Sequence, residues 1–347
     1  MSTETVSGIA RDRVDRWLAE HVDGVTPPFD YRLIAGGRSN LTYAVDDAGG
    51  RRVVLRRPPL GHVLQSAHDM GREHRIISAL APTSVPVPRP LAFCADPTLN
   101  DAPFYVMEFV DGVVLVGEQD ALRHLDEPAR AAAGRLLVDV LADLHGVDPD
   151  AVALGDLGRR EGYVERQLRR WHGQFEKSRG REIPAMDEVH RQLAAHVPPQ
   201  RRTGIVHGDY RLGNCLLGPD GTVRAVLDWE LCTLGDPLAD LGWLVAYWIE
   251  PGESAAHLRG NAPTTAPGFV TRAELIERYA RRTGADLADL DFYVALAYWK
   301  LACIAEGVHA RYRADVMGDH QVDLGAFDEQ VPRLADAALE LCRRMER

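Results

Sequence analysis

The stretch GIVHGDYRLGNCLL, residues 204–217, decides the fold prediction. It places a histidine, an aspartate and an asparagine at the spacing H-x-D-x-x-x-x-N, directly after the β-branched pair Ile205 and Val206. A turn alone needs at most one such side chain, because a single Asp or Asn can satisfy the local backbone. A carboxylate at Asp209 together with an amide at Asn214 therefore indicates a segment that carries chemistry.

A β-hairpin is predicted to follow this stretch directly. The run NCLL, the turn GPDG and the run VRAVLDWE have the pattern of two short strands joined by four residues. Asn214 starts the first strand and Asp228 ends the second. Paired strands return to the edge where they began, so we expect these two side chains to lie side by side, with Asp209 in the preceding loop.

Two carboxylates and an amide in one small volume favour magnesium chemistry. Mg²⁺ is typically held by one or two protein carboxylates and completes its shell with phosphate oxygens and water. Phosphoryl transfer requires a protein mainly to hold this metal and to position an acceptor hydroxyl. The sequence therefore predicts Asn214 and Asp228 as metal ligands and Asp209 as the catalytic residue that positions the hydroxyl.

The composition of the chain is that of an ordinary globular protein. Its 347 residues suggest two lobes or domains, and 46% of them are hydrophobic and 26% charged. The net charge of −11 argues against a protein dedicated to nucleic acid, which needs a basic surface. We expect a small-molecule hydroxylated acceptor as partner, no nucleic acid and no membrane, and a monomer or homodimer.

The cysteines and the hydropathy pattern predict a cytoplasmic protein. The five cysteines form no C-x-x-C pair, so a disulfide framework or a zinc site is not expected. The first residues contain no apolar core of the signal-peptide type. The longest uncharged apolar run, LGWLVAYWI, is shorter than the ~18 residues that a membrane-spanning helix needs.

The order of patterns along the chain predicts the α+β class. Residues 10–22 have the spacing of a short amphipathic helix, residues 31–59 that of two strands around the turn DDAGG, and residues 68–80 that of a second helix. From about residue 120 the pattern is mainly helical and carries a single β-hairpin, the one described above. We therefore expect a β-rich N-lobe over 1–108 and a mainly α-helical C-lobe over 109–347.

HGDYRLGN followed by VLDWE resembles the catalytic loop and metal-binding segment of the aminoglycoside phosphotransferase and choline kinase-like family, whose members share the protein-kinase fold. The resemblance covers about residues 30–320. The stretches VLRRPP, REHRI, VPVPRPL, YVERQLRRW and HARYR resemble one subgroup, which includes the kinase-like domain fused to some acyl-CoA dehydrogenases. The resemblance implies a bilobal protein-kinase-like fold and an ATP- and Mg²⁺-dependent small-molecule kinase.

The same resemblance implies a set of nucleotide-binding residues in the N-lobe and at the hinge. AGGRSNLTY matches the phosphate-covering loop, and YVMEFVDG matches the hinge whose backbone binds adenine. Arg56 takes the position of a phosphate-binding lysine, and Glu73 that of its ion-pair partner; an arginine can bind phosphate as a two-pronged donor. The residues expected to bind the nucleotide are Gly37, Ser39, Asn40, Arg56, Glu73, Glu108 and Val110.

The segment GDPLADLGW is expected to support the catalytic loop. Asp236 and Asp240 are interpreted as acceptors of backbone N–H groups of that loop, Trp243 as core or pocket wall, and His207 as a structural hydrogen-bonding residue.

The acceptor class is the least specified part of the prediction. The subgroup resemblance implies a hydroxy acid or a hydroxyacyl-CoA-type metabolite, and Arg169, Arg311 and Arg313 could serve an anionic acceptor. One alternative is an antibiotic kinase acting on an aminoglycoside or a macrolide, against which the basic ending ELCRRMER argues. An alternative of another class is a nucleotide-binding pseudokinase, which Arg56 in place of lysine leaves open.

Overall fold

The computed structural model describes residues 6–35, 40–60, 69–258, 262–313 and 324–345. Backbone contacts divide the chain into unit 1, Met1–Asp111 with Arg224–Glu230, and unit 2, Gly112–Val223 with Leu231–Arg347. The prediction had placed residues 109–111 and 224–230 with the C-lobe. Both stretches group with unit 1. Within it, the Val226 N–H donates to the carbonyl oxygen of Pro86 at 2.8 Å and Asp228 pairs with Arg56.

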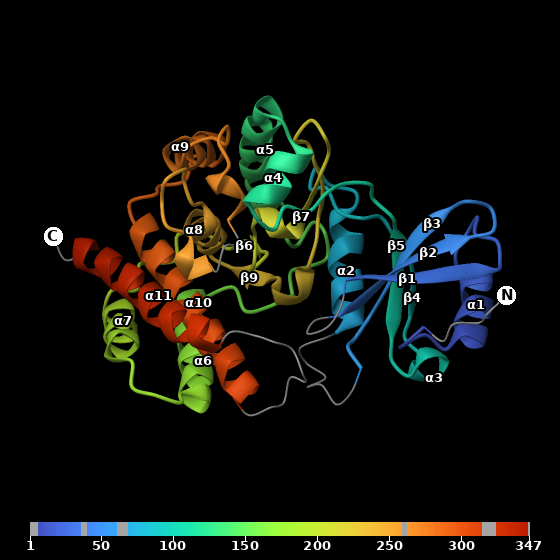
Figure 1. Ribbon diagram of the computed structural model, residues 1–347, viewed down its shortest axis with the longest axis horizontal. Helices are drawn as coiled ribbons and strands as arrows, with labels where there is room; N and C mark the ends of the chain where they lie inside the picture. The colour runs from blue at the N-terminus through green and yellow to red at the C-terminus, as the bar shows by residue number, and fades with distance from the viewer. Residues whose placement is uncertain (1–5, 36–39, 61–68, 259–261, 314–323, 346–347) are drawn as a thin grey trace. The chain divides into compact units, whose positions relative to one another are not determined.

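Unit 1 is a five-stranded antiparallel sheet with helices on both faces. Its elements are α1 (Arg11–His21), β1 (Phe29–Ala35), β2 (Leu41–Asp47), β3 (Arg52–Arg57), α2 (Met70–Leu80), β4 (Pro90–Cys94), α3 (Pro97–Asn100) and β5 (Phe104–Glu108). The strand order is β1-β2-β3-β5-β4. The sheet lies between α1 and α2 (Figure 1), and the predicted helices at 10–22 and 68–80 are confirmed.

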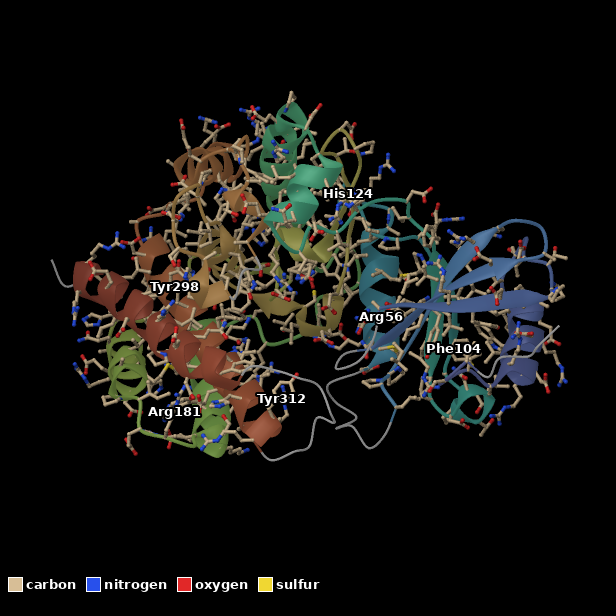
Figure 2. All side chains as sticks on the ribbon, viewed as in Figure 1. Arg56, Phe104, His124, Arg181, Tyr298 and Tyr312 are labelled. Carbon is tan, nitrogen blue, oxygen red and sulfur yellow. The ribbon has the colours of Figure 1, made fainter. Side chains whose placement is uncertain are left out.

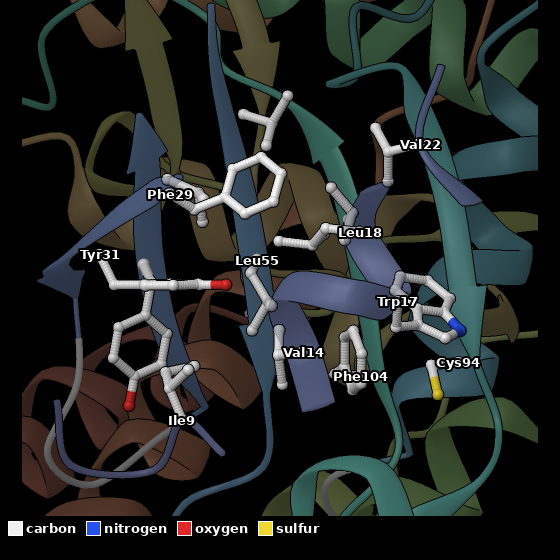
Figure 3. Packing of buried hydrophobic residues seen from close by; sticks show 14 of the residues in the cluster. Ile9, Val14, Trp17, Leu18, Val22, Phe29, Tyr31, Leu55, Cys94 and Phe104 are labelled. Carbon is white, nitrogen blue, oxygen red and sulfur yellow. The ribbon is translucent and has the colours of Figure 1, made fainter. Parts of the chain in front are cut away.

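The core of unit 1 lies between α1 and one face of the sheet (Figure 3). The apolar spacing of α1 puts Val14, Trp17 and Leu18 on one side, where all three are buried. The alternate residues of the strands, such as Leu55 and Phe104, meet them, and the rings of Trp17 and Phe104 lie edge to face at 4.8 Å. Burial of this face fixes the strand register, because a slip of one residue would turn every side chain to the other side.

The register places polar side chains on the opposite face of the sheet. Arg56 on β3 pairs with Thr42 on β2 and with Tyr105 on β5, so these three side chains lie beside one another. Glu73 of α2 is buried near them. The alternation that buries Leu55 against α1 therefore directs Arg56 toward α2.

Unit 2 is mainly helical. Its elements are α4 (Glu118–His124), α5 (Glu127–Gly146), α6 (Tyr163–Ser178), α7 (Pro184–Ala195), β6 (Gly204–Val206), η1 (Leu212–Asn214), β7 (Cys215–Leu217), β9 (Thr233–Gly235), α8 (Leu238–Tyr247), η3 (Ala256–Leu258), η4 (Pro263–Thr265), α9 (Arg272–Thr283), α10 (Leu290–Arg313) and α11 (Leu324–Met345). The remaining elements, β8 (Val223–Val226) and η2 (Trp229–Leu231), cross the boundary between the units.

The predicted β-hairpin is present, since β7 and β8 form a two-stranded sheet. The expectation that the helical part carries a single hairpin is wrong, because β6 and β9 pair antiparallel in a second small sheet. Strands of three residues are too short to show the alternation on which the prediction relied.

Helix α10 is the central element of unit 2. It packs against α6, α7, α8 and α11, and lies alongside α11 in Figure 1. One face of α5 buries Leu137, Leu141 and Leu144, whereas Leu136 and Val140 are only half-buried, because the buried face also runs through Gly134 and Val138. Among the described helices, none is long and apolar enough to cross a membrane. The β-sheet in unit 1 and the helices of unit 2 confirm the α+β class.

Candidate active site

The loop that follows β6 is held in place by one buried carboxylate. Asp240, in the first turn of α8, accepts the N–H of His207 at 2.6 Å and the N–H of Gly208 at 2.8 Å. Gly208 has φ +86°, and a Cβ there would lie 2.9 Å from the carbonyl oxygen of Leu231, so the turn requires glycine. The loop therefore has one well-defined backbone path that ends at Asp209.

Both carboxylate oxygens of Asp209 have a donor. The indole N–H of Trp243 donates to Oδ1 at 2.7 Å, and the side-chain amide of Asn214 donates to Oδ2 at 2.8 Å and to the backbone carbonyl of Asp209 at 2.7 Å. The predicted pair Asp209 and Asn214 is thus brought together by this structure. Both hydrogen bonds of Asn214 come from its amide nitrogen, so its Oδ1 is left as a possible ligand atom.

His207 has the hydrogen-bonding role expected of it. Its Nδ1 accepts the N–H of Asp209 at 3.2 Å, and the ring is fully buried. Tyr210 anchors the other side of the loop, because its hydroxyl donates to the carbonyl oxygen of Leu137 on α5 at 2.7 Å. These contacts fix where the loop begins and turns.

Asp240 is supported by a second layer of buried groups. His145 on α5 lies 3.3 Å from Oδ2 of Asp240 and contacts the Tyr279 hydroxyl with its other nitrogen at 2.8 Å. Burial alone would raise the pKa of Asp240, but the hydrogen bonds and charges of His145, His207 and Gly208 outweigh it and hold that pKa below its usual value. The carboxylate therefore stays ionised at neutral pH.

The prediction that Asp236 also braces the catalytic loop is wrong. Asp236 accepts the N–H of Leu238 at 3.0 Å and the hydroxyl hydrogen of Tyr293 at 2.7 Å, so it binds the first residue of α8 and ties it to α10. Sequence position could not separate the two aspartates, because both lie in GDPLAD beside the same helix start.

Lys300 is a neighbour of this loop whose contact the sequence did not reveal. It is the lysine of the otherwise apolar middle of α10, it is buried, and its ammonium donates to the carbonyl oxygen of Gly208 at 2.7 Å. A lone charge within an apolar helical stretch was the signal that could have identified it.

In unit 1, Arg56 bridges two acidic side chains (Arg56 is labelled in Figure 2). Its Nε donates to Glu73 at 2.8 Å, one terminal nitrogen donates to Asp228 at 3.0 Å, and the other lies 3.2 Å from the Thr42 hydroxyl. Burial alone would lower the pKa of Arg56, but Glu73, Tyr105 and Asp228 raise it above its usual value. The structure thus brings together the predicted residues Arg56, Glu73 and Asp228.

The structure describes some of the other nucleotide-binding candidates and not others. Asn40 is buried, and its amide donates to Glu73 at 2.6 Å. Glu108 ends β5 with an exposed side chain that pairs with Arg89 at 3.4 Å, and Val110 follows the strand half-buried. Gly37 and Ser39 lie outside the described residues.

The predicted metal ligands have the donor chemistry that Mg²⁺ requires. Among the described residues, Oδ2 of Asp228 and Oδ1 of Asn214 make no hydrogen bond, so each offers one hard oxygen. No cluster of three or more His, Cys, Asp or Glu side chains in the described part of the chain could hold a metal by itself. A site with one oxygen from Asp228 and one from Asn214 suits Mg²⁺, which keeps phosphate and water as its other ligands. The pairing of Asn214 with Asp228 involves both units and stays a prediction.

Comparison with known proteins agrees with this chemistry. Residues 30–293 match the Phosphotransferase enzyme family. A 328-residue alignment with acyl-CoA dehydrogenase family member 11 of Gallus gallus is 35% identical and covers 90% of this chain, but the chain spans only 40% of that relative.

Two solved structures are similar over nearly the whole chain. A protein of Ralstonia eutropha, provisionally assigned as an aminoglycoside phosphotransferase, has a TM-score of 0.80 and 34% identity over 96% of this chain and 98% of its own. An amicoumacin kinase in complex with AMP-PNP, Ca²⁺ and its antibiotic has a TM-score of 0.60 at 17% identity, over 96% of this chain and 93% of its own. These similarities confirm the protein-kinase-like fold expected from the sequence.

Proposed function

Because the chain belongs to the phosphotransferase enzyme family, we propose that it transfers the γ-phosphoryl group of ATP, with Mg²⁺, to a hydroxyl of a small molecule. The observation that carries this proposal is the carboxylate of Asp209, which two fixed donors hold at the end of a braced loop. In phosphoryl transfer the transition state is loose, so the position of the group that receives the hydroxyl proton matters more than its basicity.

The other residues take roles that follow from their chemistry. Mg²⁺ neutralises charge on the phosphates when it is bound. Asn214 and Asp228 would hold it through Oδ1 and Oδ2 respectively, the oxygen atoms that make no hydrogen bond to any described residue. Arg56 carries a permanent charge and directs donors toward anionic oxygens, with Glu73 fixing its orientation. AMP-PNP in the amicoumacin kinase supports a nucleotide triphosphate as the donor.

The remaining nucleotide contacts are assigned by position in the chain. Gly37, Ser39 and Asn40 would cover the phosphates, and backbone groups near Glu108 and Val110 would bind adenine. The division into an N-lobe over 1–108 and a C-lobe over 109–347 is part of the same proposal.

We propose a hydroxy acid or a hydroxyacyl-CoA thioester as the acceptor. The chain matches part of a protein named for acyl-CoA dehydrogenation, and a kinase within such a polypeptide would act on an acyl chain that bears a hydroxyl. Arg169 on α6 and Arg311 and Arg313 at the end of α10 are exposed cations, as an anionic acceptor requires.

Calorimetric titration with ATP, with and without Mg²⁺, tests the nucleotide site, and Asp228→Asn is the control. We expect binding that depends on Mg²⁺ in the parent protein and a lost metal dependence in the variant. Absence of binding by a folded sample would refute the kinase proposal and favour the pseudokinase alternative.

An acceptor panel then tests the substrate class. Hydroxy acids and hydroxyacyl-CoA thioesters should give ADP release and a phosphate-ester signal in ³¹P NMR that Asp209→Asn abolishes. Turnover of aminoglycosides or macrolides alone would overturn the acceptor assignment and leave the kinase proposal in place.

A further inference from the structure

The carboxylate of Asp209 depends on a tryptophan from a different element. Trp243 on α8 donates its indole N–H to Oδ1 at 2.7 Å, whereas the guanidinium Nε of Arg211 is 3.4 Å from the same oxygen. An indole N–H can only donate, so Trp243 cannot take up a proton itself. Its bond fixes the rotation of the carboxylate, to which Arg211 also donates at Oδ1.

A buried ammonium lies against the face of the same indole. The Nζ of Lys300 is 4.1 Å from the ring centroid of Trp243 and 5.5 Å from that of Trp171 on α6. The same ammonium donates to the carbonyl oxygen of Gly208, the residue before Asp209. Lys300 therefore contacts both the loop that presents the carboxylate and the ring that orients it.

The surroundings of Lys300 make its buried charge costly for the stability of the fold. Burial lowers its pKa to about 8, although Asp209 on the loop and Asp240 on α8 raise it, and Arg170 on α6 lowers it further. On α7, the ring of His190 stacks on that of Trp299, the residue before Lys300. A buried charge is costly unless it is well paired, and apolar residues often replace such charges without loss of stability.

A small cavity adjoins the ammonium. Its volume is about 20 Å³, and Gln167 and Tyr163 of α6 line it together with Lys300 and Trp243. One water needs about 10–15 Å³ and two to four polar partners, so the cavity can hold one water that accepts a second N–H of Lys300.

We propose that Trp243 and Lys300 are positioning residues for the catalytic carboxylate of Asp209, a role that rests on the function proposed above. Trp243 fixes the orientation of the carboxylate toward the acceptor hydroxyl. Lys300 holds the loop at Gly208 and, through its charge over the ring, makes the indole N–H a stronger donor, since polar groups in a chain polarise one another. In this assignment neither residue contacts the acceptor or the nucleotide, and each acts through Asp209.

The arrangement implies a dependence on pH that a purely structural role would not produce. When Lys300 loses its proton above about pH 8, the attraction to the indole face and the charge-assisted bond to Gly208 are both lost. The indole bond to Asp209 then weakens. Turnover should therefore fall on the alkaline side with a midpoint near pH 8.

The first experiment measures steady-state ADP release with MgATP as the only substrate and water as acceptor. Trp243→Phe keeps the ring and removes the N–H, so kcat should fall about tenfold to hundredfold with KM for MgATP changed less than about twofold. Trp248→Phe is the matched control: that indole N–H is also buried but donates to the carbonyl oxygen of Val270, and its loss should leave kcat unchanged. Lys300→Met should lower kcat and remove the alkaline midpoint, and Lys300→Arg should move the midpoint upward.

The second experiment needs no turnover. In ¹⁵N-tryptophan-labelled protein, the indole N–H signal of Trp243, assigned by its absence in Trp243→Phe, should titrate near pH 8. Lys300→Met should abolish that titration, and Asp209→Asn should shift the signal. The inference is overturned if the indole signal of Trp243 is unaffected by both Lys300→Met and Asp209→Asn. It is also overturned if Trp243→Phe has the wild-type kcat while Asp209→Asn is inactive. If Asp209→Asn is as active as the wild type, the proposed function itself fails. A wild type without ATP hydrolysis leaves the decision to the NMR signal.

Discussion

Asp240→Asn should destabilise the protein by about 3–5 kcal/mol, because the buried carboxylate accepts two backbone N–H groups. Asp240 is 1% exposed and receives the N–H groups of His207 and Gly208 at 2.6 and 2.8 Å, one on each oxygen. An asparagine keeps one oxygen and presents an NH₂ group to the other backbone donor. Each hydrogen bond to a charged group contributes about 1.5–3 kcal/mol, and a buried donor left without a partner costs a further ~1–3 kcal/mol.

Asp236→Asn provides a control in the same segment. Asp236 is 4% exposed, and its partners are one backbone N–H and the hydroxyl of Tyr293. A hydroxyl can accept as well as donate, so Tyr293 can turn to receive a hydrogen bond from the new NH₂ group. The cost of this change should be only about 1 kcal/mol.

Urea denaturation of both variants measures the difference, and hydrogen exchange at the amides of His207 and Gly208 shows whether the loss is local. We expect faster exchange at both amides in Asp240→Asn and little change in Asp236→Asn. Equal costs in the two variants, or a cost below about 1 kcal/mol for Asp240→Asn, would refute the reasoning that Asp240 is the brace of the loop.

The remaining predictions concern the reacting groups and the buried lysine. Asp209→Asn should abolish acceptor phosphorylation and leave MgATP affinity within about twofold, since only the positioning group changes; calorimetry beside a turnover assay would contradict this if activity persists. Asp228→Asn should remove the Mg²⁺ dependence of ATP binding, and an unchanged metal titration would exclude it as a ligand. Arg56→Lys should raise KM for MgATP roughly threefold to tenfold, because a lysine cannot contact Glu73 and Asp228 with a planar fork; an unchanged KM in steady-state kinetics would argue against the bridge. Lys300→Met should raise the free energy of unfolding at pH 7 by about 1–3 kcal/mol, because the folded state lowers the pKa of this lysine to about 8. Between pH 8 and its ordinary pKa the unfolded chain holds a proton that the folded chain lacks, so wild-type stability should rise with pH there; a variant with the same slope in urea denaturation would contradict the assignment.

Local sequence patterns were sufficient for most of the fold. The period of α1 puts Val14, Trp17 and Leu18 into one core, and strand alternation places Leu55 and Arg56 on opposite faces of the sheet. The helix at 10–22 was predictable because burial of one face is a local property of the sequence. The β6–β9 sheet escaped prediction because strands of three residues have no period to detect.

The sequence alone determined which residues are proposed to carry chemistry and in what order: the H-x-D-x-x-x-x-N spacing around Asp209 and Asn214, and the acidic end of the second hairpin strand at Asp228. Only the tertiary structure decided what surrounds them. Trp243 and Lys300 reach the catalytic loop from helices far along the chain, and Asp240 rather than Asp236 receives its N–H groups. The physical reason is that these contacts depend on how α8 and α10 pack, and packing depends on shape and burial across the whole unit, which no local pattern encodes.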